Sequence, residues 1–395
     1  MAVIVPFAAL RPMSSSAARV AAVPYDVVTT EEARALAARE PLSFLHVSRA
    51  EVDLPPGTNP YADEVYAKAV TNMEGLKREA LLQEDAASLY VYRLERNGHV
   101  QTGIAGGFSL DEYERDLIKR HERTRKEKED DRTRHIVELR AQTGPVFLVH
   151  RPSPALGLAT AAAVRQAPLY DFVAEDRIRH TLWRAGVNEA GELQRAFAAI
   201  DALYIADGHH RAASAARARR ELGSAQTVLA VAFPQDQVQI LPYNRVVLDF
   251  GPHDAATFVD ILRRDFGAVE GPAVPRRKGE VSAFTGGRWY TIALSPGNGR
   301  VDQRLDVSRL HDLLLGPVLG IGDVTRDPRI DFVGGGRGTD ALERVVRDGH
   351  AAVAFSMYPV SIDDVMQVSD AGGIMPPKST WFEPKLRDGL LSHLI

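Results

Sequence analysis

The order of apolar and polar positions predicts a chain of mixed helices and strands. A dipeptide typical of a tight β-hairpin, Asn97-Gly98, separates two strand-like runs near residues 88–94 and 99–108. Thr29 and Glu32 have the spacing of a capping box at the start of a helix that continues to about residue 39. Further short apolar runs predict strands at 3–5, 20–23, 44–47, 146–149, 202–206, 227–233, 238–241 and 353–357. Further helices are expected at 62–82, 155–166, 187–199 and 208–221. This mixture favours the α+β class over a regular alternation of strand and helix.

One long charged helix is expected from Ser109 to about Gln142, because this stretch contains neither glycine nor proline. At 100° per residue, one of its faces gathers residue types that bind phosphate or move protons. That face carries His121, Thr124, Lys128, Asp131, Arg132 and His135. A solvated charged helix with ion pairs four residues apart explains the same pattern equally well.

The chain length predicts more than one packed unit, since a single core rarely grows beyond about 250–300 residues. We expect an N-terminal α+β part at 1–150 that contains the long charged helix. A core with the Asp207–Arg211 motif is expected at 151–250, and a C-terminal α+β part at 251–395.

Composition restricts the chemistry. The net charge of -4 does not favour a nucleic-acid or membrane-surface binder. The chain contains no cysteine, which excludes disulfides, thiolate nucleophiles and zinc–thiolate sites. Neither a signal peptide nor an apolar run of about 18 residues is apparent, so we expect a cytoplasmic protein without a membrane partner.

The sequence Asp207-Gly208-His209-His210-Arg211 directly follows the apolar run 202–206 and opens a helix. Such a position favours anions, because the first amides of a helix lack internal partners and carry partial positive charge. Arg211 offers a planar fork for phosphate oxygens, and the histidines add donors whose charge is adjustable near neutral pH. Asp207 caps the helix and is also a candidate metal ligand or proton acceptor. The alternative is a plain N-cap with two half-exposed histidines.

Two other clusters carry candidate chemistry. The loop Met375–Thr380 offers phosphate-binding side chains on a proline-stiffened backbone, without the glycine spacing of a P-loop. These side chains are Lys378, Ser379 and Thr380. The N-terminal cluster lies at expected strand ends, where sites are commonly built. It comprises Arg11, Tyr25, His46 and Arg49 as substrate-binding candidates and Asp26 and Glu51 as candidate general bases. Each of these carboxylates has an equally good interpretation as a cap or a solvated charge.

Several landmarks spread over the chain resemble domain-of-unknown-function family 1015 of bacteria and archaea. They are Pro6-Phe7, Arg11-Pro12, Pro24-Tyr25-Asp26-Val27, residues 43–47, Arg120-His121-Glu122 with Thr124, Asp207–Arg211, and Met375–Thr380 with Phe382 and Pro384-Lys385. The Asp207–Arg211 motif is also similar to that of archaeal free-serine kinases of the ParB/sulfiredoxin-like superfamily.

The resemblance implies a ParB/sulfiredoxin-like core in which Gly208, His209, His210 and Arg211 hold nucleotide phosphates. It places Asp207 near a metal or the reacting hydroxyl. An acid from the N-terminal part would activate that hydroxyl, and here Glu51 and Asp26 match by position only. Sulfiredoxin chemistry needs a cysteine, which this chain lacks.

The expected function is therefore a nucleotide-dependent kinase that phosphorylates the hydroxyl of a small amino acid, with free L-serine first. Its cofactors would be ATP or ADP and Mg²⁺, with His209 among the catalytic candidates, and the question of a homodimer stays open. One alternative is a ParB-like nucleotide switch that associates with DNA, which the acidic charge and the lack of a helix-turn-helix pattern disfavour. Another is a phosphate-ester hydrolase that uses water as the nucleophile.

Overall fold

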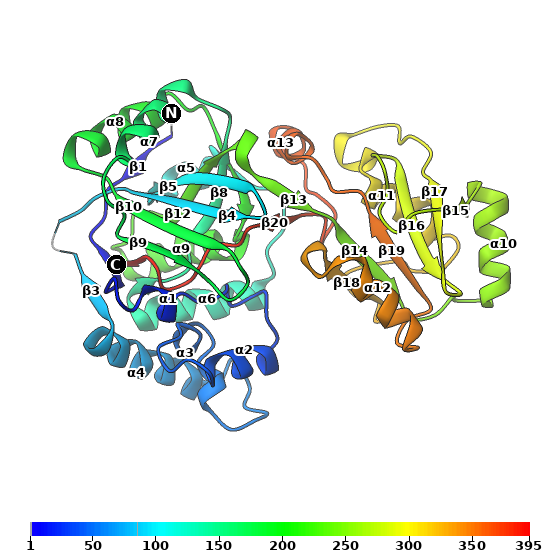
Figure 1. The fold of residues 1–395 in the computed structure, drawn as a ribbon, viewed down its shortest axis with the longest axis horizontal. Helices are drawn as coiled ribbons and strands as arrows, with labels where there is room; N and C mark the ends of the chain where they lie inside the picture. Colours follow the sequence, from blue (N-terminus) through cyan, green and yellow to red (C-terminus); the bar gives the residue numbers. More distant parts are fainter. Residues whose placement is uncertain (1, 85) are drawn as a thin grey trace. The chain divides into compact units, whose positions relative to one another are not determined.

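The computed structural model describes residues 2–84 and 86–395, which form two compact units of α+β type (Figure 1). The first unit comprises Met1–Val238 and Pro384–Ile395, and the second comprises Gln239–Glu383. From the sequence we expect three parts that are divided near residues 150 and 250. The contacts instead group residues 1–238 into one unit and return the last segment of the chain to it.

A large mixed sheet forms the centre of the first unit. Within the described residues its order is β6-β11-β8-β12-β5-β4-β10-β9, and β1 pairs with β5. Its strands are β1 (Ile4–Val5), β4 (Tyr90–Arg96), β5 (His99–Ser109), β6 (Ile118–Lys119), β8 (Val146–His150), β9 (Tyr170–Val173), β10 (Arg179–Arg184), β11 (Leu203–Asp207) and β12 (Thr227–Pro234). The pairs β6–β11 and β8–β12 are parallel, and the others are antiparallel.

Helices α7 and α8 lie together at one side of this sheet, and α2, α3 and α4 lie at the other side of the unit, where they pack with α6 and the small sheet (Figure 1). The helices of this unit are α1 (Ala17–Val20), α2 (Thr30–Ala37), α3 (Leu45–Ser48), η1 (Ala50–Asp53), α4 (Asp63–Glu79), α5 (Leu110–Glu114), α6 (Lys126–Leu139), α7 (Pro154–Ala163), α8 (Val187–Phe197), α9 (His209–Leu222) and η2 (Gln235–Gln237). A small sheet joins β3 (Leu81–Gln83), β2 (Ala9–Pro12), β21 (Ser392–Leu394) and β7 (Ala141–Gln142).

The second unit has its own sheet and its own apolar core. The sheet order is β15-β17-β16-β19-β14-β18. Its strands are β14 (Tyr243–Val247), β15 (Val269–Glu270), β16 (Glu280–Thr285), β17 (Arg288–Ala293), β18 (Ile330–Gly334) and β19 (Val353–Met357), and β13 (Gln239–Leu241) pairs separately with β20 (Trp381–Glu383). Its helices are α10 (Ala255–Phe266), η3 (Val301–Arg304), α11 (Asp306–Leu310), η4 (His311–Leu315), η5 (Gly335–Arg337), α12 (Gly338–Arg347) and α13 (Ile362–Asp370).

Local sequence signals are confirmed where they specify a turn or a cap. Asn97 and Gly98 both have positive φ and join β4 to β5, as a two-residue hairpin requires. The capping box between Thr29 and Glu32 starts α2. The predicted run 202–206 is β11, and helix α9 follows it directly.

The prediction of one helix over 109–142 is wrong. Helix α5 ends at Glu114, Asp116 takes a left-handed backbone conformation, and Ile118 pairs with Leu203 in the large sheet. Helix α6 begins only at Lys126. His121 and Thr124 therefore lie on a loop, and the shared helix face does not exist. Sheet pairing and the burial of Ile118 outweighed the helical composition of this stretch.

The strands expected at 44–47 and 20–23 are also wrong. Residues 45–48 form α3, and α1 ends at Val20. Phe44, Leu45 and Val47 are buried in the apolar cluster that α2, α3 and α4 share. A short run that is buried all round lacks the alternation by which a strand is distinguished from a helix.

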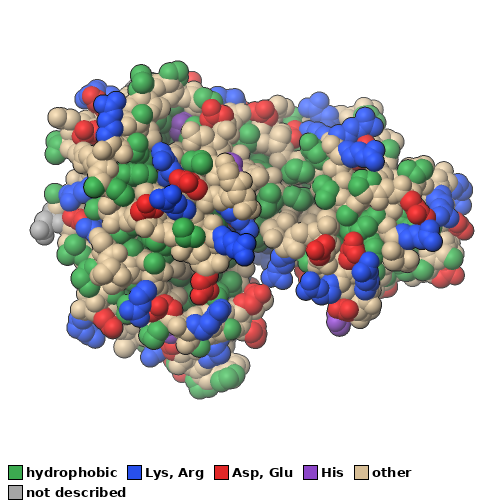
Figure 2. Space-filling model, in the orientation of Figure 1, with side chains coloured by type: hydrophobic (Ala, Val, Ile, Leu, Met, Phe, Trp, Pro, Cys, Tyr) green, Lys and Arg blue, Asp and Glu red, His purple; other side chains and the backbone are tan. Residues whose placement is uncertain are grey.

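The surface of the first unit mixes charges of both signs. On the face that Figure 2 shows, Lys and Arg side chains alternate with Asp and Glu, as the small net charge leads one to expect. Among the described residues, no helix is both long enough and apolar enough to span a bilayer.

Candidate functional site

The turn between β11 and α9 requires glycine at position 208. Gly208 has φ 95° and ψ 30°, a left-handed conformation that other residues rarely adopt. A Cβ atom built there would lie only 2.9 Å from Nε and 3.0 Å from Cζ of Arg211. The glycine thus serves both the turn and the close approach of the guanidinium, and α9 begins with amides that have no acceptor within the helix.

Asp207 and Arg211 form an ion pair across this turn. The Arg211 NH2 group donates to Asp207 Oδ2 at 3.2 Å, its NH1 group donates to the Pro145 carbonyl, and Lys385 Nζ lies 3.4 Å from the same Asp207 oxygen. Burial opposes ionisation of Asp207, but Lys385 and Arg211 hold its pKa well below the usual range. Two cations lie beside this carboxylate, and the role of Asp207 as a metal ligand stays a prediction.

The two motif histidines hold the loop that precedes α6. His210 Nε2 accepts a hydrogen bond from the backbone amide of Arg125 at 3.0 Å, and His209 Nε2 accepts from that of His121 at 3.4 Å. His210 is half-buried and His209 is buried. The motif thereby fixes residues 121–125 against the start of α9.

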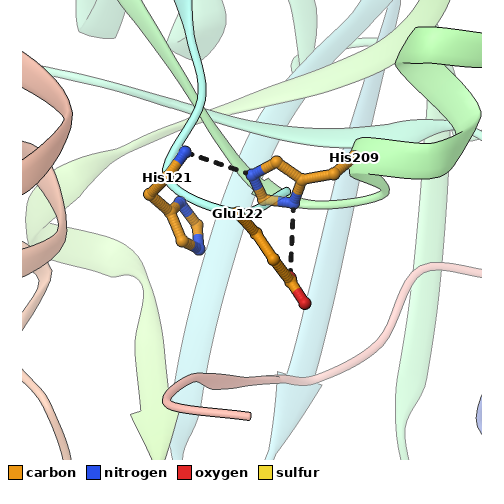
Figure 3. A group of neighbouring side chains, drawn as sticks. All are labelled: His121, Glu122 and His209. Carbon is orange, nitrogen blue, oxygen red and sulfur yellow. Dashed lines mark hydrogen bonds and ion pairs between the residues drawn. The ribbon is translucent and has the colours of Figure 1, made fainter. Parts of the chain in front are cut away.

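His121, Glu122 and His209 gather at this contact (Figure 3). Glu122 Oε2 lies 3.7 Å from His209 Nδ1, and the two imidazole rings meet edge to face with centroids 4.5 Å apart. His121 is 2% exposed, and neither of its ring nitrogens has a hydrogen-bond partner within the described chain. A buried polar group left in this state costs about 1–3 kcal/mol.

Burial keeps both rings of this cluster uncharged at neutral pH. It lowers the pKa of His121 to about 4, and the pKa of His209 also falls well below that of an exposed histidine. The sequence led us to expect a charge on His209 that is adjustable near neutral pH, whereas burial of the ring and its neighbours His121, His210 and Arg211 lower its pKa away from that range.

Arg211 also lines a small cavity of about 30 Å³. Four of its charged or aromatic lining residues come from separate segments of the first unit: Tyr25, Arg132 of α6, Arg211 and the C-terminal Asp388. The Arg132 guanidinium carbon stacks 4.2 Å from the centroid of the Tyr25 ring. The buried Nε atom of Arg211 has no hydrogen-bond partner among the described residues. The remaining lining residues are Ser48, His135, Ile136, Gln142, Thr143, Gly144 and Val228.

Asp388 is the buried carboxyl of this cavity. Burial raises its pKa to about 7, although Arg211 lowers it. Gly144 lies so close that a Cβ atom there would approach Asp388 Oδ1 to 2.7 Å. The cavity thus combines two guanidinium groups with a carboxyl group that is partly protonated near neutral pH.

The expected N-terminal candidates divide into two groups. Arg49 donates to the Tyr25 carbonyl at 2.8 Å and to Glu51 Oε1 at 2.6 Å, so it positions the segment that carries Tyr25 and Asp26. Glu51 is 3% exposed and engaged in this ion pair. Asp26 is exposed, and its charge acts on Arg211 and Asp388.

Arg11 and His46 contact other partners. Arg11 donates to Glu84 Oε1 at 2.6 Å and to the hydroxyl of Tyr170 at 3.0 Å. His46 Nδ1 lies 2.8 Å from Asp53 Oδ1. Neither residue lines the cavity beside Arg211.

The remaining phosphate-binding candidates also have partners. The Thr124 hydroxyl donates to Glu129, and Lys128 Nζ donates to the Tyr61 hydroxyl at 2.7 Å. Lys378, Ser379 and Thr380 belong to the second unit, whereas Asp207–Arg211 belong to the first. Within that unit, Ser379 donates to the Pro376 carbonyl at 2.6 Å, and Lys378 Nζ lies 5.4 Å from the centroid of the Tyr243 ring.

Three residues of this region have no site role in the expectations from the sequence: Arg132, Lys385 and Asp388. Arg132 was noted only as part of a helix face, and Pro384-Lys385 only as a landmark of the resemblance. The one available signal was that Pro384-Lys385 and the Asp207–Arg211 motif both belong to the landmarks of the resemblance, and this says nothing about their distance in space. Only the return of the chain terminus to the first unit brings Lys385 and Asp388 to Asp207 and Arg211.

Comparison with known proteins identifies the family. The family described as "Protein of unknown function (DUF1015)" matches residues 4–308, and the chain belongs to it. No curated protein matches the sequence.

Several solved structures are similar over much of their length. A conserved hypothetical protein from Pyrococcus furiosus shares 16% identity, with a TM-score of 0.38 over 73% of this chain and 95% of that one. A free serine kinase in complex with AMP shares 16% identity, with a TM-score of 0.37 over 72% and 92%. SbnI from Staphylococcus aureus, with a C-terminal truncation, shares 12% identity, with a TM-score of 0.33 over 73% and 87%.

Proposed function

We propose that the first unit is a nucleotide-dependent phosphotransferase that phosphorylates the hydroxyl of a small amino acid, with free L-serine as the first substrate to test. The observation that carries this proposal is the cavity in which Arg132 and Arg211 meet the Asp388 carboxyl beside the Gly208 turn. We also propose that the core of the first unit has a ParB/sulfiredoxin-like fold.

Phosphoryl transfer depends mainly on neutralising charge and on positioning the reactants. The Nε atom of Arg211 is a buried donor without a partner within the described chain, so an anionic oxygen would satisfy it. The first amides of α9 and the guanidinium of Arg132 supply further positive potential. At about 30 Å³ the cavity admits a water molecule or the tip of a ligand, so the rest of a nucleotide has to lie outside it.

A general base has to accept the proton of the acceptor hydroxyl. Glu51 is paired with Arg49, which leaves Asp26 and Asp388 as carboxyl candidates. We assign the role to Asp388, because it lines the cavity and its pKa of about 7 suits proton exchange at neutral pH. Magnesium would arrive bound to the phosphates of ATP or ADP, and no step here depends on a protein ligand to it.

The test is to incubate the full chain with ATP or ADP, magnesium chloride and L-serine and to measure phosphoserine by mass spectrometry. Replacing Arg211 by lysine keeps the charge but removes the paired N–H donors of the planar guanidinium, so we expect nucleotide binding to weaken by about tenfold or more. The matched control is Arg220→Lys on the exposed side of the same helix, which should bind nucleotide as the wild type does.

The outcomes separate the alternatives. Absence of phosphorylated product with every hydroxyl amino acid would refute the kinase, and release of phosphate without an acceptor would establish a hydrolase instead. An Asp388→Asn variant that retains full activity would refute the assignment of the base while leaving the kinase in place.

A further inference from the structure

We infer that His121, Glu122 and His209 form a binding site for a divalent transition-metal ion, with Zn²⁺ as the ion that fits best. This site is independent of the proposed kinase activity, and it gives the two buried histidines a different role from the phosphate contacts that their sequence suggested.

The geometry brings three candidate ligands to one place. One ligand atom from each residue lies within 4.8 Å of the other two, and Glu122 Oε2 is 3.7 Å from His209 Nδ1. In Figure 3 a dashed line joins the Glu122 carboxylate to the His209 ring, and the His121 ring lies beside them. Ligands at about 2.0–2.2 Å from a tetrahedral zinc ion are roughly 3.4 Å apart. Closing the cluster around an ion therefore needs side-chain shifts of about 1 Å or less.

The buried imidazole of His121 is the independent sign of a missing partner. Both of its ring nitrogens are buried, and neither makes a hydrogen bond of normal geometry within the described residues, although the Ile205 backbone faces the ring. A metal ion beside one nitrogen would satisfy a group that the protein alone leaves unsatisfied. The Glu122 side chain is 41% exposed, which gives an ion a route from solvent.

The ligand chemistry selects the metal. Magnesium and calcium prefer oxygen ligands, whereas two imidazoles and one carboxylate are a set found in catalytic zinc sites. Metal ions bind the neutral form of an imidazole, in which one ring nitrogen has a lone pair available. Three protein ligands leave a fourth position for water or for an oxygen of an anion.

Proton positions change in a defined way when the metal binds. In its absence His209 Nε2 accepts from the His121 amide, so the ring proton lies on Nδ1 and faces Glu122. A zinc ion at Nδ1 moves that proton to Nε2 and ends the contact with the amide. That contact measures 3.4 Å, longer than a normal N–H hydrogen bond, so the bond that the metal has to replace is a weak one.

The experiment measures zinc binding by the full chain after treatment with a chelator. Equilibrium dialysis against Zn²⁺ alone, followed by elemental analysis, should find one tightly bound ion per chain, and Mg²⁺ should not displace it. Substituting Co²⁺ provides a spectroscopic readout, since nitrogen and oxygen coordination of low symmetry gives visible absorption bands.

Two variants and a control decide the assignment. Glu122→Gln and His121→Leu should each weaken zinc binding by at least about tenfold. The matched control is Glu127→Gln, which removes the same charge from an exposed position five residues further along the chain. Equal zinc binding by the wild type and Glu122→Gln would overturn the site, as would absence of a stoichiometric ion. Neither result depends on whether the protein phosphorylates serine.

Discussion

The two ends of α9 offer a direct test of how the Gly208 turn is built. Gly208 precedes the helix with φ 95°, and Gly223 follows it with φ 70°. A Cβ atom at Gly223 would meet no other atom within 4 Å, whereas one at Gly208 would press on the guanidinium of Arg211. Replacing each by alanine therefore separates the backbone strain, which both share, from the steric contact, which only Gly208 has.

The magnitudes follow from these two contributions. A left-handed backbone costs a non-glycine residue about 1–2 kcal/mol, which is the whole loss expected for Gly223→Ala. At Gly208 the methyl group would also displace Arg211 from its hydrogen bond with Asp207. A hydrogen bond between charged groups contributes about 1.5–3 kcal/mol, so Gly208→Ala should lose roughly 2.5–5 kcal/mol in total.

Hydrogen exchange of the β8 and β12 amides at increasing urea concentration would report the free energy of unfolding of the first unit alone. We expect the Gly208→Ala loss to exceed the Gly223→Ala loss by at least about 1.5 kcal/mol. The double variant with Arg211→Ala should remove most of that difference, since the obstructing guanidinium is gone. Equal losses at the two glycines would refute the view that Gly208 is required by the contact with Arg211.

Two further predictions concern the interior of the first unit. Burial lowers the pKa of His135 to about 4, so the folded state binds fewer protons than the unfolded state between pH 4 and about 6.5. The neutral His135 ring therefore contributes about 3 kcal/mol to the free energy of unfolding above pH 6.5, and this contribution is lost as the pH falls toward 4. In urea unfolding over this pH range, the stability of His135→Gln should depend less steeply on pH than that of the wild type. An equally steep dependence would contradict this. Gly144→Ala would place a methyl group 2.7 Å from Asp388 Oδ1 and fill the cavity. The rate of the proposed phosphorylation of serine should then fall by about tenfold or more. Full activity of this variant would show that the cavity has no part in the reaction.

Part of the fold was predictable because its signals are local. The hairpin at Asn97-Gly98 and the capping box of Thr29 and Glu32 depend on backbone conformations and hydrogen bonds between near neighbours. The prediction failed at residues 115–125 for the opposite reason. There, pairing of Ile118 with Leu203, more than eighty positions away, decided the conformation.

The candidate site shows the same division. The sequence alone determined that β11 ends in a glycine turn at the start of α9, with Arg211 in its first turn, since a strand, a turn and a helix start follow from adjacent residues. Tertiary structure alone decided that Arg132 and Asp388 join Arg211 around one cavity and that His209 is buried and neutral. Burial and charge depend on which distant segments exclude water from a side chain, and the order of residues along the chain does not contain that information.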